Sequence, residues 1–91
     1  MSEIRSDPAK RAKTIAERGL DMDRAGEVFD SPHLTIPDQR LNYGEDRFVT
    51  VGRLDGRMVV LAWTWRGEDI RIISVRKANV REQRKFADRL A

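Results

Sequence analysis

The 91-residue sequence contains no cysteine and only one histidine, His33. Disulfides and thiolate metal sites are therefore excluded, and a lone loop histidine has no partner with which to bind a metal. No stretch approaches the roughly 20 apolar residues of a membrane span, and the first ten residues hold no apolar signal-peptide segment. These absences predict a cytoplasmic protein, folded as one domain over residues 1–91, without metal, cofactor or membrane partner.

Motifs of several enzyme classes are also missing. The glycines form no phosphate-binding loop, because Gly52, Gly56 and Gly67 fall in a predicted strand and two predicted turns. There is no nucleophile paired with a histidine, and no acidic cluster of the kind that binds magnesium. Any phosphodiester chemistry would therefore depend on cationic side chains and on a nucleophile that the substrate supplies.

Positive charge is concentrated at the end of the chain. Residues 71–91 carry seven lysines and arginines against two acidic residues, a net charge of +5, whereas residues 1–70 have a net charge of −2. Six of the basic residues lie in the stretch RIISVRKANVREQRKF: Arg71, Arg76, Lys77, Arg81, Arg84 and Lys85. Each one alone fits a solvated surface, but the group favours a local anion site.

The sequence predicts an α+β fold with N-terminal helices, a three-stranded antiparallel β-meander and a basic C-terminal helix. Residues 8–18 are typical of a helix that begins after Asp7 and ends at Gly19. A second short helix is expected from near Asp21 to before Ser31. Residues 33–46 look irregular, apart from a short strand at 34–36.

The period of the apolar residues changes to two after residue 47. We expect strands at 48–54, 57–65 and 69–76, joined by turns at 55–56 and 67–68, because Asp-Gly is a favoured hairpin turn. Asn79 with Glu82 three residues later predicts a capping box at the start of the last helix.

Counting register from these turns assigns the strand residues to two faces, both apolar. The valine face is predicted to hold Val49, Val51, Val60, Ala62, Ile73 and Val75. The tryptophan face is predicted to hold Phe48, Val59, Leu61, Trp63, Trp65, Ile70, Ile72 and Arg76. Either the chain's own helices cover both faces, or one face is an interface with a partner protein.

Several side chains are candidates for chemistry. Arg76 and Arg81 lie at the strand–helix junction, where guanidinium groups bind phosphate and stabilise an anionic transition state. Trp63 and Trp65 are candidates for stacking RNA bases, with core packing or a partner interface as the alternative. Glu45, in the stretch NYGEDRF with Tyr43, is a candidate base.

Three segments, DPAK, ERGLDMDRAGEVFD and YGEDRFVTVGRLDGRMVVLAWTWRGEDIRIISVRKANVREQRKF, resemble the BrnT-type toxins of type II toxin–antitoxin modules. The resemblance runs from Asp7 to about Phe86, and it is most specific in RIISVRKA and REQRKF. It implies a compact RelE-like ribonuclease fold and an RNA endonuclease that blocks translation. It also implies an antitoxin with a ribbon-helix-helix segment, which binds operator DNA.

Carried over by motif, the resemblance implies site residues along the chain. Catalytic candidates are Arg76, Arg81, Arg84 and Glu45. RNA-binding candidates are Arg53, Arg66, Lys77, Lys85 and Arg47. Two positions depart from the family pattern, because Arg18 and Leu41 stand where members often have histidine. Either another group moves protons in this chain, or the chain is a weak or inactive toxin.

We expect metal-independent cleavage in which the 2′-hydroxyl of the RNA is the nucleophile. We also expect the antitoxin to cover the tryptophan face beside Arg76 and so to block the site, with Trp63 and Trp65 at the interface. The alternatives are a non-catalytic member that binds RNA or a partner, and a small DNA-binding repressor, for which no helix-turn-helix is evident.

Overall fold

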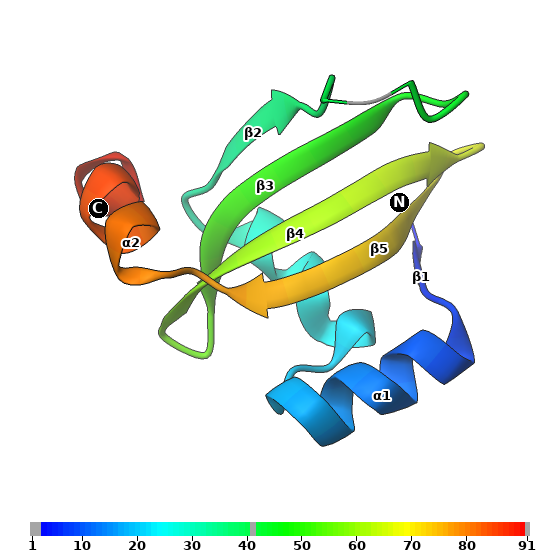
Figure 1. The fold of residues 1–91 in the computed structure, drawn as a ribbon, viewed down its shortest axis with the longest axis horizontal. Coiled ribbons are helices and arrows are strands. Elements are labelled where there is room, and N and C mark those ends of the chain that lie inside the picture. The colour runs from blue at the N-terminus through cyan, green and yellow to red at the C-terminus, as the bar shows by residue number, and fades with distance from the viewer. Residues whose placement is uncertain (1–2, 41, 91) are drawn as a thin grey trace.

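A computed structural model describes residues 3–40 and 42–90. Its centre is a five-stranded mixed sheet in the order β1-β5-β4-β3-β2 (Figure 1). The strands are β1 (Ile4–Arg5), β2 (Leu34–Pro37), β3 (Arg47–Leu54), β4 (Arg57–Arg66) and β5 (Asp69–Lys77). β1 pairs with β5 in parallel, and the other neighbours are antiparallel. The predicted α+β class is confirmed, but the predicted three-stranded sheet is wrong because β1 and β2 extend the meander at its two edges.

Local signals set the helix ends as expected. The Asp7 carboxylate accepts a hydrogen bond from the Ala9 N–H at the start of α1 (Pro8–Arg18), and Gly19 ends the helix in the left-handed region at φ 67°. Asp21 caps η1 (Met22–Asp30), which is a 3₁₀-helix. The expected capping box between Asn79 and Glu82 begins α2 (Val80–Phe86), and η2 (Ala87–Leu90) follows it. None of these helices is long and apolar enough to cross a membrane, within the residues that the structure describes.

The predicted hairpin registers are also confirmed, since Leu54 pairs with Arg57 and Arg66 pairs with Asp69. Both residues of the Asp55-Gly56 turn have positive φ, at 54° and 77°, as a type I′ turn requires.

A β-bulge between β4 and β5 changes the predicted faces. Ala62 pairs with Ser74 but Trp63 pairs with Ile72, so Ile73 is an extra residue without a partner on β4. Beyond the bulge the alternation is shifted by one residue. Val75 therefore lies beside Leu61 on the tryptophan face, and Arg76 lies beside Val60 on the valine face. The prediction that Arg76 shares a face with the tryptophans is wrong.

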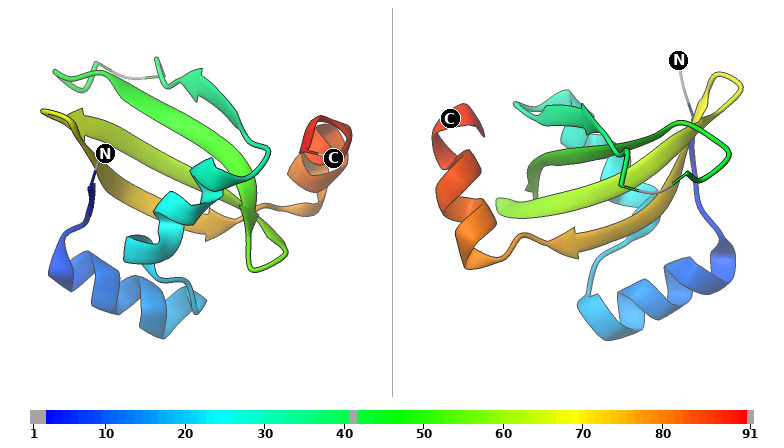
Figure 2. Two further views of the ribbon diagram at one scale, coloured as in Figure 1. Left: turned by 180° about the vertical axis from the view of Figure 1, so that it is seen from behind. Right: turned by 45° about the horizontal axis from the view of Figure 1, so that its top comes forward.

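The tryptophan face is covered by η1 and by Leu20 before it, and α1 packs on η1. Leu20 and residues of η1 pack against this face around Leu61, Trp63 and Ile72, and these three side chains are buried. Figure 2 shows α1 and η1 together on one side of the sheet, away from α2. The fit is close, because a Cβ atom at Gly52 would collide with the side chain of Val28.

The valine face has a smaller cover. Its core cluster contains Val51, Val60, Ala78 and Leu90, with Phe86 packed against it. The C-terminal helices therefore cover one end of this face and leave a groove beside them.

Candidate functional site

The groove lies on the valine face and has a volume of about 360 Å³. Its apolar lining comes from Ile36, Pro37, Val49, Val51, Val60 and Phe86, and its polar lining from Asp38, Gln39, Arg40, Arg76, Arg81, Glu82 and Lys85. Residues from β2, from the sheet centre and from α2 thus meet in one place. Three of the predicted site residues, Arg76, Arg81 and Lys85, are brought together here.

Arg76 is held in a fixed orientation by Glu82. Its two terminal nitrogens, Nη1 and Nη2, donate hydrogen bonds of 2.7 and 2.9 Å to the two carboxylate oxygens of Glu82. Glu82 also accepts a hydrogen bond from the Asn79 N–H, so one carboxylate both caps α2 and orients the arginine. The hydrogen bond from Arg76 is the main reason that the pKa of Glu82 falls to about 2. Glu82 is therefore ionised at neutral pH, and it is a weak proton acceptor.

Arg40 is a groove residue that sequence reasoning missed. The Glu82 hydrogen bond raises the pKa of Arg76, while electrostatic repulsion from Arg40 acts in the opposite direction, which places the two cations within each other's field. Arg40 donates to Asp38 through Nε and Nη2 at 2.9 and 3.0 Å, and this pairing lowers the pKa of Asp38 to about 2. No local motif marks Arg40, because it reaches the groove only through the pairing of β2 with β3.

The cations of the groove outnumber its carboxylates. Arg40 and Arg76 each have one carboxylate partner, whereas Arg81 and Lys85 form no salt bridge within residues 3–40 and 42–90. Four positive side chains face two negative ones, so the groove has a net charge of +2. Such an excess beside an apolar floor favours an anionic ligand that also has an apolar part.

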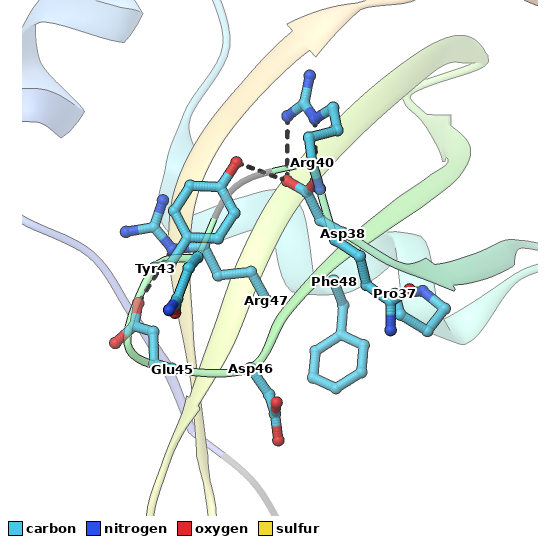
Figure 3. Close-up of a pocket in the computed structure, with 10 residues that line it drawn as sticks. Pro37, Asp38, Arg40, Tyr43, Glu45, Asp46, Arg47 and Phe48 are labelled. Atoms are coloured by element: carbon cyan, nitrogen blue, oxygen red, sulfur yellow. Dashed lines mark hydrogen bonds and ion pairs between the residues drawn. The ribbon is translucent and has the colours of Figure 1, made fainter.

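A second cluster surrounds Glu45 in the loop before β3 (Figure 3). One oxygen of Glu45 accepts a hydrogen bond from Arg66 at 2.9 Å, and the other accepts one from Arg47 at 3.1 Å. These two arginines lower the pKa of Glu45. The Arg47 guanidinium lies 4.0 Å from the centre of the Tyr43 ring. The structure therefore brings three predicted site residues, Glu45, Arg47 and Arg66, into contact, with the carboxylate ionised and paired with both arginines.

The two clusters are neighbours. The Tyr43 hydroxyl donates a hydrogen bond of 3.3 Å to Asp38, whose carboxylate also binds Arg40 (Figure 3). The hollow around Tyr43 and Glu45, about 540 Å³ in volume, shares the segment 37–40 with the groove. The two hollows are therefore continuous along this segment, and Arg66, Arg47 and Arg40 each pair with a carboxylate there.

Other predicted site residues lie outside both clusters. Arg53 donates a 2.8 Å hydrogen bond to the Leu90 carbonyl and so anchors the C-terminal helices to the sheet. Arg84 is exposed on α2 and does not line the groove. Lys77 lines a shallow hollow beside the Asp55-Gly56 turn.

The two tryptophans have different environments. Trp63 is only 5% exposed, stacks on Phe48 and donates a hydrogen bond to Thr50, so it is a core residue. Trp65 is 46% exposed and meets Trp63 edge to face. Of the pair, only Trp65 offers substantial surface to a partner.

Three positions bear on histidine chemistry: His33, Arg18 and Leu41. His33 is exposed in the loop after η1, where its Nδ1 lies 2.8 Å from the Ser31 carbonyl oxygen. Arg18 donates to the Val75 carbonyl beside the bulge. Leu41 lies outside the described residues. Within the described chain, no group of three histidine, cysteine or acidic residues is arranged to hold a metal ion.

Comparison with known proteins gives the family. A family model described as a ribonuclease toxin, BrnT, of type II toxin–antitoxin systems matches residues 7–82. The chain belongs to the BrnT toxin family. The crystal structure of the Brucella abortus ribonuclease toxin BrnT at 1.1 Å resolution is similar to it, with 26% identity and a TM-score of 0.70. The similarity covers 87% of this chain and 99% of the Brucella chain. Among curated proteins, none matches this sequence.

The BrnT match spans both clusters. It includes Glu45, Arg47 and Arg66 and continues through Arg76 to Glu82. Lys85 lies beyond it, although the groove brings Lys85 next to residues of the matched region.

Proposed function

We propose that this BrnT-family toxin is a metal-independent endoribonuclease that blocks translation in the cytoplasm. The observation that carries the proposal is the groove, where Arg76, Arg81 and Lys85 meet with a net excess of positive charge. A phosphodiester in this groove would have cationic hydrogen-bond donors on the side of α2 and on the side of β5. The RelE-like architecture implied by the sequence belongs to the same proposal.

The chemistry uses the RNA's own nucleophile. The 2′-hydroxyl loses its proton to water and its oxygen attacks the adjacent phosphorus. The bond from phosphorus to the 5′-oxygen breaks, the 5′-oxygen takes a proton from water, and the product strand ends in a 2′,3′-cyclic phosphate. Arg76 and Arg81 stabilise the extra negative charge on the phosphoryl oxygens in the transition state. Glu82 orients Arg76, and Lys85 binds the backbone nearby.

Glu45 is proposed to position two arginines and not to act as a general base. Its pKa is lowered by Arg66 and Arg47, so it has little tendency to take a proton at neutral pH. We propose that Glu45 holds these two arginines in position to bind the RNA backbone next to the groove. Arg84 and Lys77 add positive charge near α2 and increase the affinity for RNA.

The partners follow from the family. We propose that a cognate antitoxin with a ribbon-helix-helix segment neutralises the toxin and connects it to operator DNA. Since Trp63 is buried in the core, Trp65 is the tryptophan at which this antitoxin makes contact. Steric occlusion of the groove would require the antitoxin to reach the valine face as well.

The second candidate is a non-catalytic member that only binds RNA or a protein. It is favoured by one observation: both carboxylates that line the groove, Asp38 and Glu82, have a pKa of about 2. Neither is suited to accept a proton at neutral pH.

Induced expression separates the two candidates. The proposal expects wild-type protein to stop translation and growth, and co-expression of the antitoxin to restore both. The double variant Arg76→Ala/Arg81→Ala should be harmless at equal protein levels. Wild-type protein that leaves growth and translation unaffected would instead favour the binding-only candidate. Arrest by the double variant at the wild-type level would mean that the reacting phosphate does not lie in the groove.

A further inference from the structure

The floor of the groove is apolar, although its rim is charged. Val51 and Val60 are almost buried, and Ile36 on the edge strand β2 is 52% exposed. Phe86 closes the floor from α2, against the same cluster. A phosphate group alone gains nothing from contact with this apolar surface. The ligand should therefore carry an apolar portion next to its charge.

The rim brings together cations from opposite sides. Arg40 enters from the segment after β2, and Arg81 and Lys85 enter from α2. Arg40 and Arg76 are close enough for their repulsion to oppose the rise in the pKa of Arg76, although Arg40 is paired with Asp38 and Arg76 with Glu82. A phosphate between these cations would relieve the repulsion.

We propose that the groove seats one unpaired nucleotide of an RNA strand. The nucleobase lies on the floor made by Ile36, Val60 and Phe86, and its phosphate lies at the rim between Arg40 and Arg76. This inference rests on the proposed function for the identity of the ligand as RNA. It assigns Arg40 as a substrate-binding residue and Ile36 as part of the base seat.

The dimensions favour a nucleotide over a protein segment. A volume of about 360 Å³ is at the small end of the range of roughly 300–1,000 Å³ that is typical of small-ligand pockets. A stable protein interface takes in about 20–30 residues on each partner, roughly twice the number that line this groove. Because a base on the floor cannot remain stacked or paired, the seat accepts single-stranded RNA.

The test uses three small probes with the purified full-length protein: uridine 5′-monophosphate, uridine and inorganic phosphate. Binding is followed by NMR shifts of the backbone amides, which also report whether each variant is folded. Ile36→Ser removes part of the seat, and its matched control is Ile15→Ser, an exposed isoleucine of α1 outside the groove. Arg40→Ala removes a rim cation, and its matched control is Arg24→Ala, an exposed arginine of η1 that is also paired with carboxylates.

The inference expects the monophosphate to bind in the groove more tightly than uridine or phosphate. Ile36→Ser should weaken monophosphate binding roughly fivefold and leave phosphate binding unchanged. Arg40→Ala should weaken both ligands by about fivefold, and the two controls should change neither.

Two results would refute the proposed nucleotide site. One is equal binding of monophosphate and phosphate, since the apolar floor would then contribute nothing to binding. The other is that none of the three probes shifts the amide signals of the groove. Failure of the proposed function gives a different result. If the protein does not cleave RNA but monophosphate binding depends on Ile36 and Arg40, the nucleotide site is supported and the ribonuclease mechanism is refuted.

Discussion

Arg76→Ala should nearly abolish cleavage and leave the fold intact. In the structure, Arg76 is a preorganised donor pair, since Glu82 fixes its guanidinium through two hydrogen bonds. Loss of one such transition-state donor typically lowers kcat by about 10²–10³. Arg76→Lys should recover only part of the loss, because an ammonium group cannot donate two parallel hydrogen bonds.

The same substitution should have a small effect on stability. The Arg76 side chain is 45% exposed, and Glu82 keeps its hydrogen bond to the Asn79 N–H. The ion pair therefore contributes about 1 kcal/mol at most. For a domain of this size, 1 kcal/mol corresponds to a fall in Tm of about 4–8 °C, which is the upper limit expected for Arg76→Ala.

The assay measures initial rates of cleavage of a fluorescent RNA, with Tm from circular dichroism on the same samples. Arg71→Ala is the matched control, because Arg71 lies on the same strand and on the valine face but does not line the groove. A folded Arg76→Ala protein that cleaves at the wild-type rate would refute the reasoning. The reacting phosphate would then have to lie elsewhere, with Arg66 and the Glu45 cluster as the next candidates.

Three further predictions concern pH, the core and the close packing of the sheet. The folded pKa of Glu82 is about 2, below its usual 4.5, so its contribution to stability is complete above pH 4.5 and is lost as pH falls toward 2. The free energy of unfolding, measured with denaturant, should therefore fall between pH 7 and pH 3 by about 1 kcal/mol less in Glu82→Gln than in the wild type. Trp63→Ala should cost about 3–5 kcal/mol in urea unfolding, whereas Trp65→Ala should cost under about 1 kcal/mol and weaken antitoxin binding in calorimetry; equal costs would contradict their different burial. Gly52→Ala should destabilise the protein by about 1–3 kcal/mol, because the new methyl group meets Val28, and an unchanged Tm would show that η1 can move away from the sheet.

Features with local causes were predictable from the sequence. The Asp7 cap, the Asn79–Glu82 capping box and the Asp55-Gly56 turn each depend on residues within a few positions of one another. The hairpin registers followed from these turns, so most strand residues were assigned to the correct face.

Features with non-local causes were not predictable from the sequence. The bulge at Ile73 leaves no mark in an alternating strand, yet it moves Arg76 to the opposite face from Trp63. Strand β1 has only two residues, too few to show a period. Arg40 lies in the groove with Arg76 only because β2 pairs with β3. No sequence motif near Arg40 predicts this position.

The most direct test of the ribonuclease mechanism is incubation of the purified protein with RNA in excess EDTA, followed by analysis of the product ends. The account predicts cleavage that EDTA does not affect, with 2′,3′-cyclic or 3′-phosphate ends, and its suppression by the cognate antitoxin. Cleavage that EDTA abolishes and magnesium restores would contradict the mechanism, since the arginines of the groove would then not suffice to stabilise the transition state.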